Sequence, residues 1–406
     1  MSSCLICNRG IEPFISFGRM PIANGFLLPE NFTDEYFFNL GVAFCPHCYM
    51  VQLSELVDPT KLFHENYAYY SSISVRMAQH FKEFSQMVRQ RYLSCPDPLV
   101  VEIGSNDGIM LQNYMQAGIR HVGVEPSANV ARAALEKGVH TVCRFFDEQA
   151  GDDLRGEYGP ADAILGANVI CHIPSLDAVI IGVKKLLKED GVFIFEEPYL
   201  GDIIDKTSYD QFYDEHVCYF SLSSLGHLFA RHGMEIIDVM PQPVHGGSMR
   251  YVIARRGARP IGPTVTERLF REESLGLREP GTYAQLGQRI FRSRERLVSL
   301  LTELKQQGHH IVGYGATSKS TTVTNFCRIG PELIDYISDT TPGKQGKYSP
   351  GVHIPVLPYE RFKEHYPDYA LLFAWNHGEE IMAKEERFKA AGGKWLVYVP
   401  QVGVIE

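Results

Sequence analysis

The stretch "VVEIGSNDGIML", residues 100–111, decides how the middle of this chain folds. An apolar run comes first, a glycine turn follows, and a helix start comes last. That is the order of a first strand and its ligand-binding loop in an open α/β sheet. A dinucleotide site has the spacing G-x-G-x-x-G, with glycines under a pyrophosphate. Here Gly104 and Gly108 stand four residues apart with Asn106 and Asp107 between them, so the loop is poorly suited to phosphates.

The acidic character of this loop indicates a different ligand. A loop with carboxylates suits the cationic, phosphate-free amino-acid end of S-adenosylmethionine (SAM), because opposite charges attract. Glu125 follows Gly104 by 21 residues and ends the second predicted strand, where a carboxylate can accept hydrogen bonds from ribose hydroxyls. We therefore predict SAM binding by Gly104, Asn106, Asp107, Gly108 and Glu125. A doubly wound domain without a ligand remains the alternative.

Short apolar segments alternate with helical ones around this loop, which predicts a parallel sheet. Strands are predicted at 99–103, 121–125, 139–146, 161–168 and 191–197, and two closing strands at 234–240 and 249–255. Seven strands with a hairpin-like last pair is the count of a class I methyltransferase sheet. The helix before them carries Met77, Phe81, Phe84 and Val88 at the spacing of one buried face.

A second, smaller α/β unit is predicted after a long amphipathic helix, because the strand pattern restarts at "HHIVGYGA" (309–316). The predicted fold class is thus α/β, with a small zinc-binding domain before the seven-stranded sheet and a Rossmann-like domain after it. The predicted boundaries are a zinc-binding domain at 1–64, a SAM domain at 65–258, a helical linker at 259–308 and a nucleotide-sugar domain at 309–406.

Two Cys-x-x-Cys pairs near the N-terminus predict a structural metal site. Cys4 and Cys7 form the first pair, and Cys45 and Cys48 form the second. Each pair lets two thiolates of a tight turn face one metal, and two such turns complete a tetrahedral zinc site without an open position for water. The alternative is a set of unrelated buried thiols, which is also how we interpret the other five cysteines.

Composition narrows the classes of function. The chain has 406 residues and a formal net charge of −9, and it contains no long block of Lys and Arg, which argues against nucleic acid as the main partner. No apolar run approaches the roughly 20 residues that span a bilayer, so no membrane is expected. The N-terminus lacks the features of an export signal, and we expect a cytoplasmic protein.

The second glycine loop, "GYGATSKSTTVTNF", follows a strand and opens a helix. Backbone N–H groups at a helix start, together with Ser318 and Lys319, would hold a diphosphate. The loop lacks the G-K-[ST] ending of a Walker A motif, so ATP hydrolysis is not expected. Asp339 ends the next predicted strand and could meet a ribose, while Lys344 and Lys347 add positive charge nearby. A domain used only for packing is the alternative.

Several motifs together resemble one family, the SAM-dependent C-3 methyltransferases of deoxysugar pathways. The resemblance covers essentially the whole chain and rests on both Cys-x-x-Cys pairs and on "VEIGSNDG", "GANVICHIPSL", "EEPYL", "YDEHVCYFS", "HGGSMR", "GYGATSKS" and "DTTPGKQGKYSPG". It implies methylation of carbon 3 of a 4-keto-6-deoxysugar linked to thymidine or guanosine diphosphate. It also implies a sugar site between the middle and C-terminal domains.

Candidate site residues follow from the matching motifs. The resemblance supplies candidates for the reaction cleft and one for the cofactor. The cleft candidates are Tyr213, Glu215, His216, His172 and a tyrosine of "NYAYYSS", for which we choose Tyr67, and the cofactor candidate is Asn168. Methylation next to a ketone requires a base, a donor for the enolate oxygen and an aligned methyl group. Neutral imidazole suits the base, and His216 is the first choice, oriented by Glu215 or Tyr213. His172 is the second choice, and a hydrogen-bonded scaffold is the alternative for both.

Rival functions remain open from sequence alone. They are a non-catalytic module that binds SAM or a nucleotide sugar, a methyltransferase for another small substrate, a methyltransferase for RNA or protein, and a nicotinamide-dependent oxidoreductase. The negative net charge disfavours the RNA enzyme, and the spacing of the first glycine loop disfavours the oxidoreductase.

Overall fold

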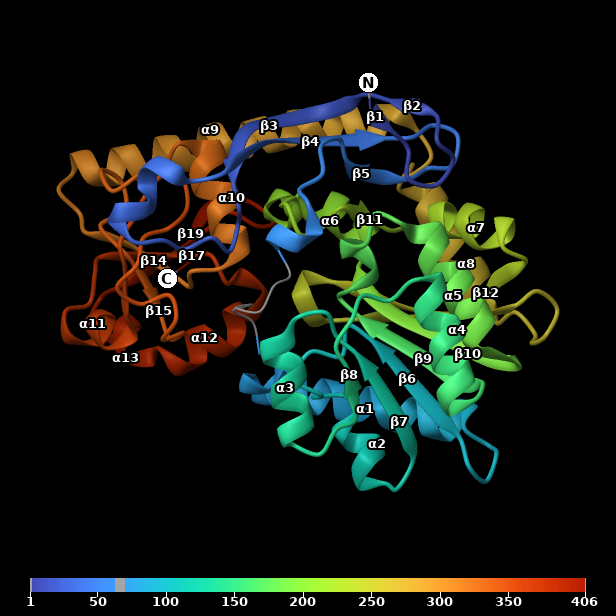
Figure 1. Cartoon of the computed structure of the whole chain (residues 1–406). Coiled ribbons are helices and arrows are strands. Elements are labelled where there is room, and N and C mark those ends of the chain that lie inside the picture. The colour runs from blue at the N-terminus through green and yellow to red at the C-terminus, as the bar shows by residue number, and fades with distance from the viewer. Residues whose placement is uncertain (1, 63–69, 406) are drawn as a thin grey trace.

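The computed structural model describes residues 2–62 and 70–405 and contains three larger sheets. The N-terminal sheet lies along the top of the molecule in Figure 1, above the seven-stranded central sheet on one side and the C-terminal unit on the other. This arrangement confirms the predicted α/β class and the seven-stranded central sheet.

The N-terminal sheet is antiparallel and has the strand order β11-β5-β4-β3. Its strands are β3 (Pro13–Pro21), β4 (Phe37–Phe44), β5 (Val51–Leu53) and β11 (Cys218–Tyr219), and a separate pair consists of β1 (Ser2–Ser3) and β2 (Gly10–Ile11). The strand β11 comes from the "YDEHVCYFS" run, so that run also joins the N-terminal sheet to the middle of the chain. Short 3-10 turns η1 (Pro29–Asp34), η2 (Pro59–Lys61) and η3 (Ser71–Ile73) connect these parts.

The central sheet has the order β12-β13-β10-β9-β6-β7-β8. Its strands are β6 (Leu99–Ile103), β7 (Arg120–Val124), β8 (Thr141–Val142), β9 (Ala161–Ala167), β10 (Leu187–Pro198), β12 (Met234–Gln242) and β13 (Ser248–Arg255). The first five are parallel, and β13 pairs antiparallel with both β10 and β12. Because the carboxyl ends of β6, β7 and β9 meet at one edge, the loops after them share one crevice.

The helices of this middle part pack on the sheet faces. They are α1 (Val75–Tyr92), α2 (Gln112–Gln116), α3 (Ala128–Glu136), α4 (Glu148–Tyr158), α5 (Leu176–Leu186), α6 (Leu200–Lys206) and α7 (Leu222–Arg231). The α1 face predicted from its periodicity is buried, and the Ser221 side chain caps the start of α7.

The segment predicted as a helical linker is packed against the other parts. It contains α8 (Pro263–Ser274) and α9 (Pro280–Gln306). On α8 the fully buried Glu272 accepts the N–H groups of Leu222 and Ser223 at 2.6 and 2.9 Å, which satisfies two donors at the start of α7. The helix α9 buries its leucine stripe and contacts β3 and α10 (Ser318–Cys327), as Figure 1 shows.

The C-terminal sheet has the order β16-β15-β14-β17-β18-β19 and is parallel except for β19. Its strands are β14 (Ile311–Tyr314), β15 (Ile337–Asp339), β16 (Val356–Pro358), β17 (Tyr369–Leu372), β18 (Lys394–Val397) and β19 (Gly403–Ile405). Besides α10, this unit contains α11 (Tyr359–Glu364), α12 (Gly378–Lys384) and α13 (Glu386–Ala390). It is the second α/β unit that the restart of the strand pattern predicts.

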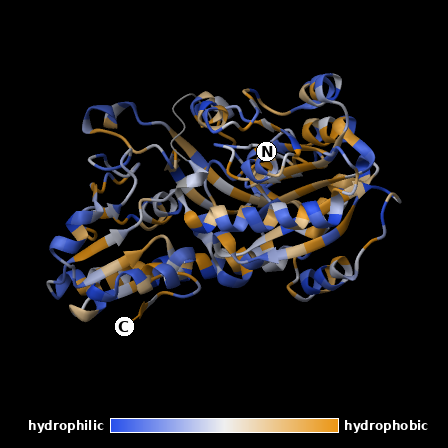
Figure 2. Ribbon diagram, turned by 90° about the horizontal axis from the view of Figure 1, so that it is seen from below, coloured by the Kyte–Doolittle hydropathy of each residue, from blue (hydrophilic) through white to orange (hydrophobic). Residues whose placement is uncertain are grey.

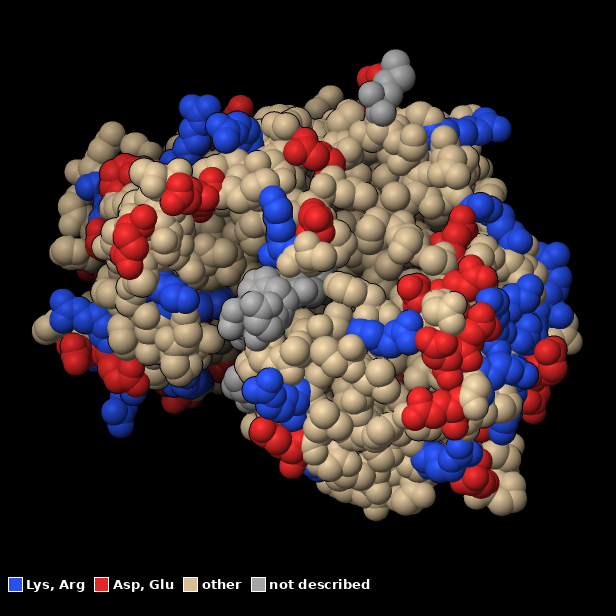
Figure 3. Space-filling view, in the orientation of Figure 1, with Lys and Arg blue, Asp and Glu red and all other residues tan. Residues whose placement is uncertain are grey.

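Apolar side chains from all three larger sheets form one extended buried cluster, and two smaller clusters lie beside α1 and within the C-terminal unit. In Figure 2 the apolar colour concentrates on the strands, while helices alternate between apolar and polar faces. On the face shown in Figure 3 acidic and basic side chains are interleaved. Surface ion pairs include those of Lys185 with Glu148 and Asp152. No helix of the described residues is long and apolar enough to cross a membrane.

Candidate functional site

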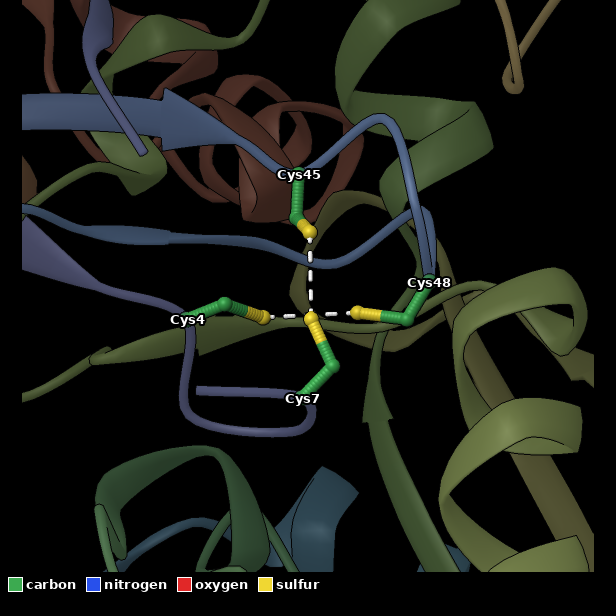
Figure 4. Close-up of side chains that lie close together, drawn as sticks. All are labelled: Cys4, Cys7, Cys45 and Cys48. Atoms are coloured by element: carbon green, nitrogen blue, oxygen red, sulfur yellow. Dashed lines mark hydrogen bonds between the residues drawn. The ribbon is translucent and has the colours of Figure 1, made fainter. Parts of the chain in front are cut away.

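The four predicted zinc ligands converge on one point. The Sγ atoms of Cys4 and Cys48 are 3.3 Å apart, those of Cys7 and Cys45 are 3.5 Å apart, and all four lie within 4.8 Å of one another (Figure 4). A tetrahedral zinc with four bonds of about 2.3 Å holds its sulfur atoms about 3.8 Å apart. The cysteines are free thiols at nearly that separation.

The backbone of the two pairs explains how the thiols meet. After each pair one residue adopts a left-handed conformation, Asn8 at φ 58° and Tyr49 at φ 63°. The N–H of each donates to the carbonyl of the first cysteine of its pair, at 2.9 and 2.8 Å. Two copies of the same turn therefore aim two pairs of sulfur atoms at one position, as a closed structural zinc site requires.

A cavity of about 600 Å³ lies where the three sheets meet. Its size is within the range of small-molecule sites. The predicted site residues that line it are Gly104, Asn106, Glu125, Asn168, His172, Tyr213, Glu215, His216, Ser318, Lys319 and Lys344. Three predicted residues, Asp107, Gly108 and Asp339, lie outside the lining, and Tyr67 lies outside the described residues.

On the side of the central sheet, the first glycine loop forms the cavity wall. Gly104 has φ +66°, and a Cβ there would stand 2.5 Å from a methyl carbon of Val169. The glycine is thus required by the close approach of the chain after β9. The carboxylate of Glu125 accepts the N–H of Asn106 at 3.0 Å and that of Ser127 at 2.8 Å, which leaves further lone pairs for hydroxyl groups. Burial raises the pKa of Glu125.

The side chain of Asp107 points away from this wall. It is 1% exposed, and its Oδ2 forms an ion pair of 2.8 Å with Lys137 and bonds Ser72. Gly108 has φ +80°, and a Cβ there would stand 2.9 Å from Val139. Both residues therefore shape the loop and its neighbours, and neither reaches the cavity.

The "YDEH" run supplies the opposite wall. His216 Nε2 is 2.7 Å from the hydroxyl oxygen of Tyr213, and the His216 ring stacks on that of His172 at 5.3 Å. Burial lowers the pKa of His172 to about 4. Burial also lowers the pKa of His216 well below its usual value, and the neighbouring His172 and Lys319 reinforce that decrease. Both imidazoles are therefore neutral at physiological pH.

The partner of Glu215 comes from the N-terminal part of the chain. Its Oε1 accepts the side-chain N–H of Asn24 at 3.0 Å, and Asn24 Oδ1 accepts from Lys344 Nζ at 3.3 Å. Of the two residues that we expected to orient His216, Tyr213 contacts it directly and Glu215 is bound to Asn24. Burial raises the pKa of Glu215, and the Asn24 hydrogen bond and the Lys344 charge oppose that increase.

The third wall is the start of α10. Thr317, Ser318 and Lys319 line the cavity, and the Thr317 side chain accepts the N–H of Ser320 as an N-cap. A helix start together with Lys319 and Lys344 makes this wall electropositive. Burial lowers the pKa of both lysines.

Asp339 stabilises this turn from behind. Its carboxylate accepts the N–H groups of Ala316 and Thr341 at 2.6 and 2.7 Å.

Sequence reasoning missed three residues at this cavity. Asn24 and His245 line it, and Asp210 accepts hydrogen bonds from Trp375 and Tyr398 just behind Lys319. His245 Nε2 lies 3.3 Å from the side-chain nitrogen of Asn168. Both residues have a left-handed backbone, with φ 54° at His245 and 52° at Asn168. The "HGGSMR" motif contains His245 and could have drawn attention to it, whereas Asn24 stands in no recognisable pattern.

One further group has the composition of a metal site. Ligand atoms of Cys171, His172 and His216 lie within 4.8 Å of one another. This group offers three protein ligands, whereas the four cysteines supply all four ligands of a closed structural zinc site. The four-cysteine cluster is the better zinc site of the two.

Comparisons with known proteins agree with this geometry. A zinc-binding domain model matches residues 4–63, a methyltransferase domain model residues 76–239, and a model of the C-methyltransferase C-terminal domain residues 243–400. C-methyltransferase NovU of Streptomyces niveus is 36% identical over 408 residues, which cover 100% of this chain and 97% of that protein. The chain belongs to the C-methyltransferase family. It is a SAM-dependent C-methyltransferase with a zinc-binding domain.

Two solved methyltransferases each resemble a little under half of this C-methyltransferase, 44% of the chain in both cases. Magnesium protoporphyrin IX methyltransferase of Synechocystis PCC 6803, with S-adenosylhomocysteine bound, is 16% identical over 44% of this chain and 83% of its own, with a TM-score of 0.35. A SAM-dependent methyltransferase of Clostridium acetobutylicum is 14% identical over 44% of this chain and 92% of its own, with a TM-score of 0.36. At these scores the structures carry no argument about the site, and the family rests on the full-length relative.

Proposed function

We propose that this C-methyltransferase methylates carbon 3 of a 4-keto-6-deoxysugar linked to a nucleoside diphosphate, through an enolate. The observation that carries the proposal is one cavity with three chemically different walls. The wall at Gly104 and Glu125 suits SAM, the wall at Lys319 suits a diphosphate, and neutral imidazoles lie on the wall at His216.

The SAM wall would hold the cofactor by backbone and carboxylate contacts. Asn106 and the backbone of Gly104 would meet the amino-acid end, and Glu125 would accept from the ribose hydroxyls. Asn168, which ends the neighbouring strand in a left-handed conformation, would complete this side. When bound, SAM supplies an electrophilic methyl group.

The His216 wall would handle the proton. The C-3 proton would pass to the neutral imidazole of His216, and the electron pair of the C–H bond would enter the enolate. The enolate carbon would then take the methyl group of SAM as the S–CH3 bond breaks, which leaves S-adenosylhomocysteine. Tyr213 is close enough to hold the imidazole by its hydroxyl. The carboxylate of Glu215 offsets the positive charge that His216 gains, and Lys319 and Lys344 stabilise the enolate and the diphosphate.

The test is isotope exchange together with methyl transfer. Enzyme and candidate 4-keto sugars linked to thymidine or guanosine diphosphate are incubated in heavy water with a SAM analogue, and exchange at C-3 is followed by NMR. His216→Asn should keep both ligands bound but lose exchange and methyl transfer by about 100-fold or more, because an amide cannot accept the proton. Tyr213→Phe should cost less.

Three outcomes would change the proposal. Normal exchange with failed methylation in His216→Asn would make His216 a positioning residue and direct the search for the base to His172. Retained activity would remove His216 from the reaction. Mass spectrometry that finds no added methyl on any nucleotide-linked keto sugar, with SAM still bound, would favour another small substrate.

A further inference from the structure

The turn that follows β3 brings the zinc-binding part of the chain into the reaction cavity. Ala23 in this turn donates its N–H to Asp214 Oδ1 at 2.9 Å, and its carbonyl accepts from Thr321 Oγ1 at 2.8 Å. One residue of the turn after β3 is thus bound to the "YDEH" run and to α10 at the same time. The next residue, Asn24, lines the cavity.

The amide of Asn24 has one orientation that satisfies both of its partners. Its Nδ2 donates to the Glu215 carboxylate at 3.0 Å, and its Oδ1 accepts from the Lys344 ammonium at 3.3 Å. Turning the amide over would place N–H groups against an ammonium and an oxygen against a carboxylate. Both contacts involve charged groups, so they are stronger than bonds between neutral groups.

We propose that Asn24 is a positioning residue for methyl transfer, because its amide holds Glu215 and Lys344 at the cavity wall. The inference rests on the proposed role of Glu215 and extends it to the zinc-binding part of the chain. In the zinc-binding part, the metal site lies beyond the end of the β3–β4 pair at which Pro13 faces Ala43. Asn24 lies beyond the opposite end, at which Pro21 faces Phe37.

The protonation of Glu215 makes this role measurable. Burial raises its pKa, and the Asn24 hydrogen bond is the largest effect that lowers it again, followed by the charge of Lys344. Loss of the amide donor should therefore move the Glu215 pKa upward. The titratable groups that interact with this carboxyl are Asp214, Cys171 and Lys344, and His216 and His172 line the same cavity.

The decisive variant is Asn24→Asp, which keeps the size of the side chain and an oxygen for Lys344 but sets a second carboxylate against Glu215. The second carboxylate should raise the pKa of Glu215. Because the base must face an ionised Glu215, the acid limb of the kcat/KM profile should then move to higher pH, and kcat/KM on that limb should fall about tenfold for each unit by which the pKa rises. Asn24→Ala should move it in the same direction. Zinc content and SAM affinity should match the wild type.

Asn39→Asp is the matched control, because Asn39 makes the same kind of bond, 2.9 Å to Glu55, on the exposed surface of the same sheet. This variant should leave the profile in place. A readout that needs no activity is the 13C NMR titration of the Glu215 carboxyl in glutamate-labelled protein, assigned by its disappearance in Glu215→Gln.

The outcomes separate this inference from the proposed function. An unchanged Glu215 titration in both Asn24 variants, in folded protein with its zinc, overturns the role of Asn24. A shifted titration with an unchanged activity profile supports the contact and removes Glu215 from the reaction. A shift of both in the Asn24 variants, and of neither in Asn39→Asp, supports the inference.

Discussion

Two glycine loops each follow a parallel strand, β6 in the central sheet and β14 in the C-terminal sheet, and their surroundings present opposite charges to the cavity. The loop after β6 faces the cavity with its backbone and Asn106, and the carboxylate of Glu125 stands beside it at the end of β7. The loop after β14 presents the start of α10, with Lys319 and Lys344 beside it. The same topology can therefore receive a cationic ligand on one side and an anionic one on the other, because the side chains around each loop set its potential.

The largest effect should come from neither loop but from the zinc site that supports the sheet between them. Structural zinc contributes on the order of 10 kcal/mol in small zinc-finger peptides. Cys48→Ser should reduce bound zinc from about one per chain to near zero, lower the temperature of unfolding, and weaken both ligands together. Metal analysis and calorimetry test this, and a metal-free protein of full stability would contradict it.

On the SAM side, Gly104→Ala should reduce SAM affinity about 100-fold. Its Cβ would meet Val169 at 2.5 Å, and the residue would have to keep a positive φ. Gly118 is the matched control, because it has φ +67° and nothing within 4 Å of an added Cβ. Gly118→Ala should lower the free energy of unfolding by only about 1 kcal/mol, the cost of an alanine in the left-handed conformation, and should keep its SAM affinity. Equal loss of SAM affinity in both variants, measured by calorimetry, would show that the contact with Val169 is unimportant.

At the wall with Lys319, Lys319→Ala should weaken the binding of a nucleoside diphosphate about tenfold and leave SAM affinity unchanged. The reason is that a hydrogen bond to a charged group contributes about 1.5–3 kcal/mol. Lys347→Ala is the control, because this lysine belongs to the same unit but does not line the cavity. Titrations with thymidine and guanosine diphosphate measure both variants. A parallel loss of SAM affinity would indicate a general disturbance of the fold.

The smallest effect should be a pair of opposite pH dependences. Burial raises the pKa of Glu125, so its carboxylate is protonated at a higher pH than a free one, and SAM affinity should fall a few-fold as the pH is lowered through that value. Burial lowers the pKa of Lys319 and Lys344, so nucleotide affinity should fall as the pH is raised. Titrations from pH 5 to 9 test both, and curves of the same sign would contradict the charge difference between the loops.

Local patterns in the sequence predicted much of this structure. Strand and helix periodicity gave the order of both α/β units, and the spacing of Cys4, Cys7, Cys45 and Cys48 gave the metal cluster. Such features depend on residues close together in the chain, whose spacing is set by helix and strand geometry. The first glycine loop and the wall at His216 were placed at the cavity for the same reason, although their roles in the reaction remain proposals.

Only the tertiary structure decided which side chains meet across the units. Asp107 stands in the predicted loop but turns to Lys137, and the predicted linker is packed through Glu272 and α9. Asn24 is separated from Glu215 by 191 residues and from Lys344 by 320, and no local periodicity records such a contact. The sequence by itself determined the units and their loops, because those follow from neighbouring residues. The partners inside the cavity depend on how three separate sheets pack together.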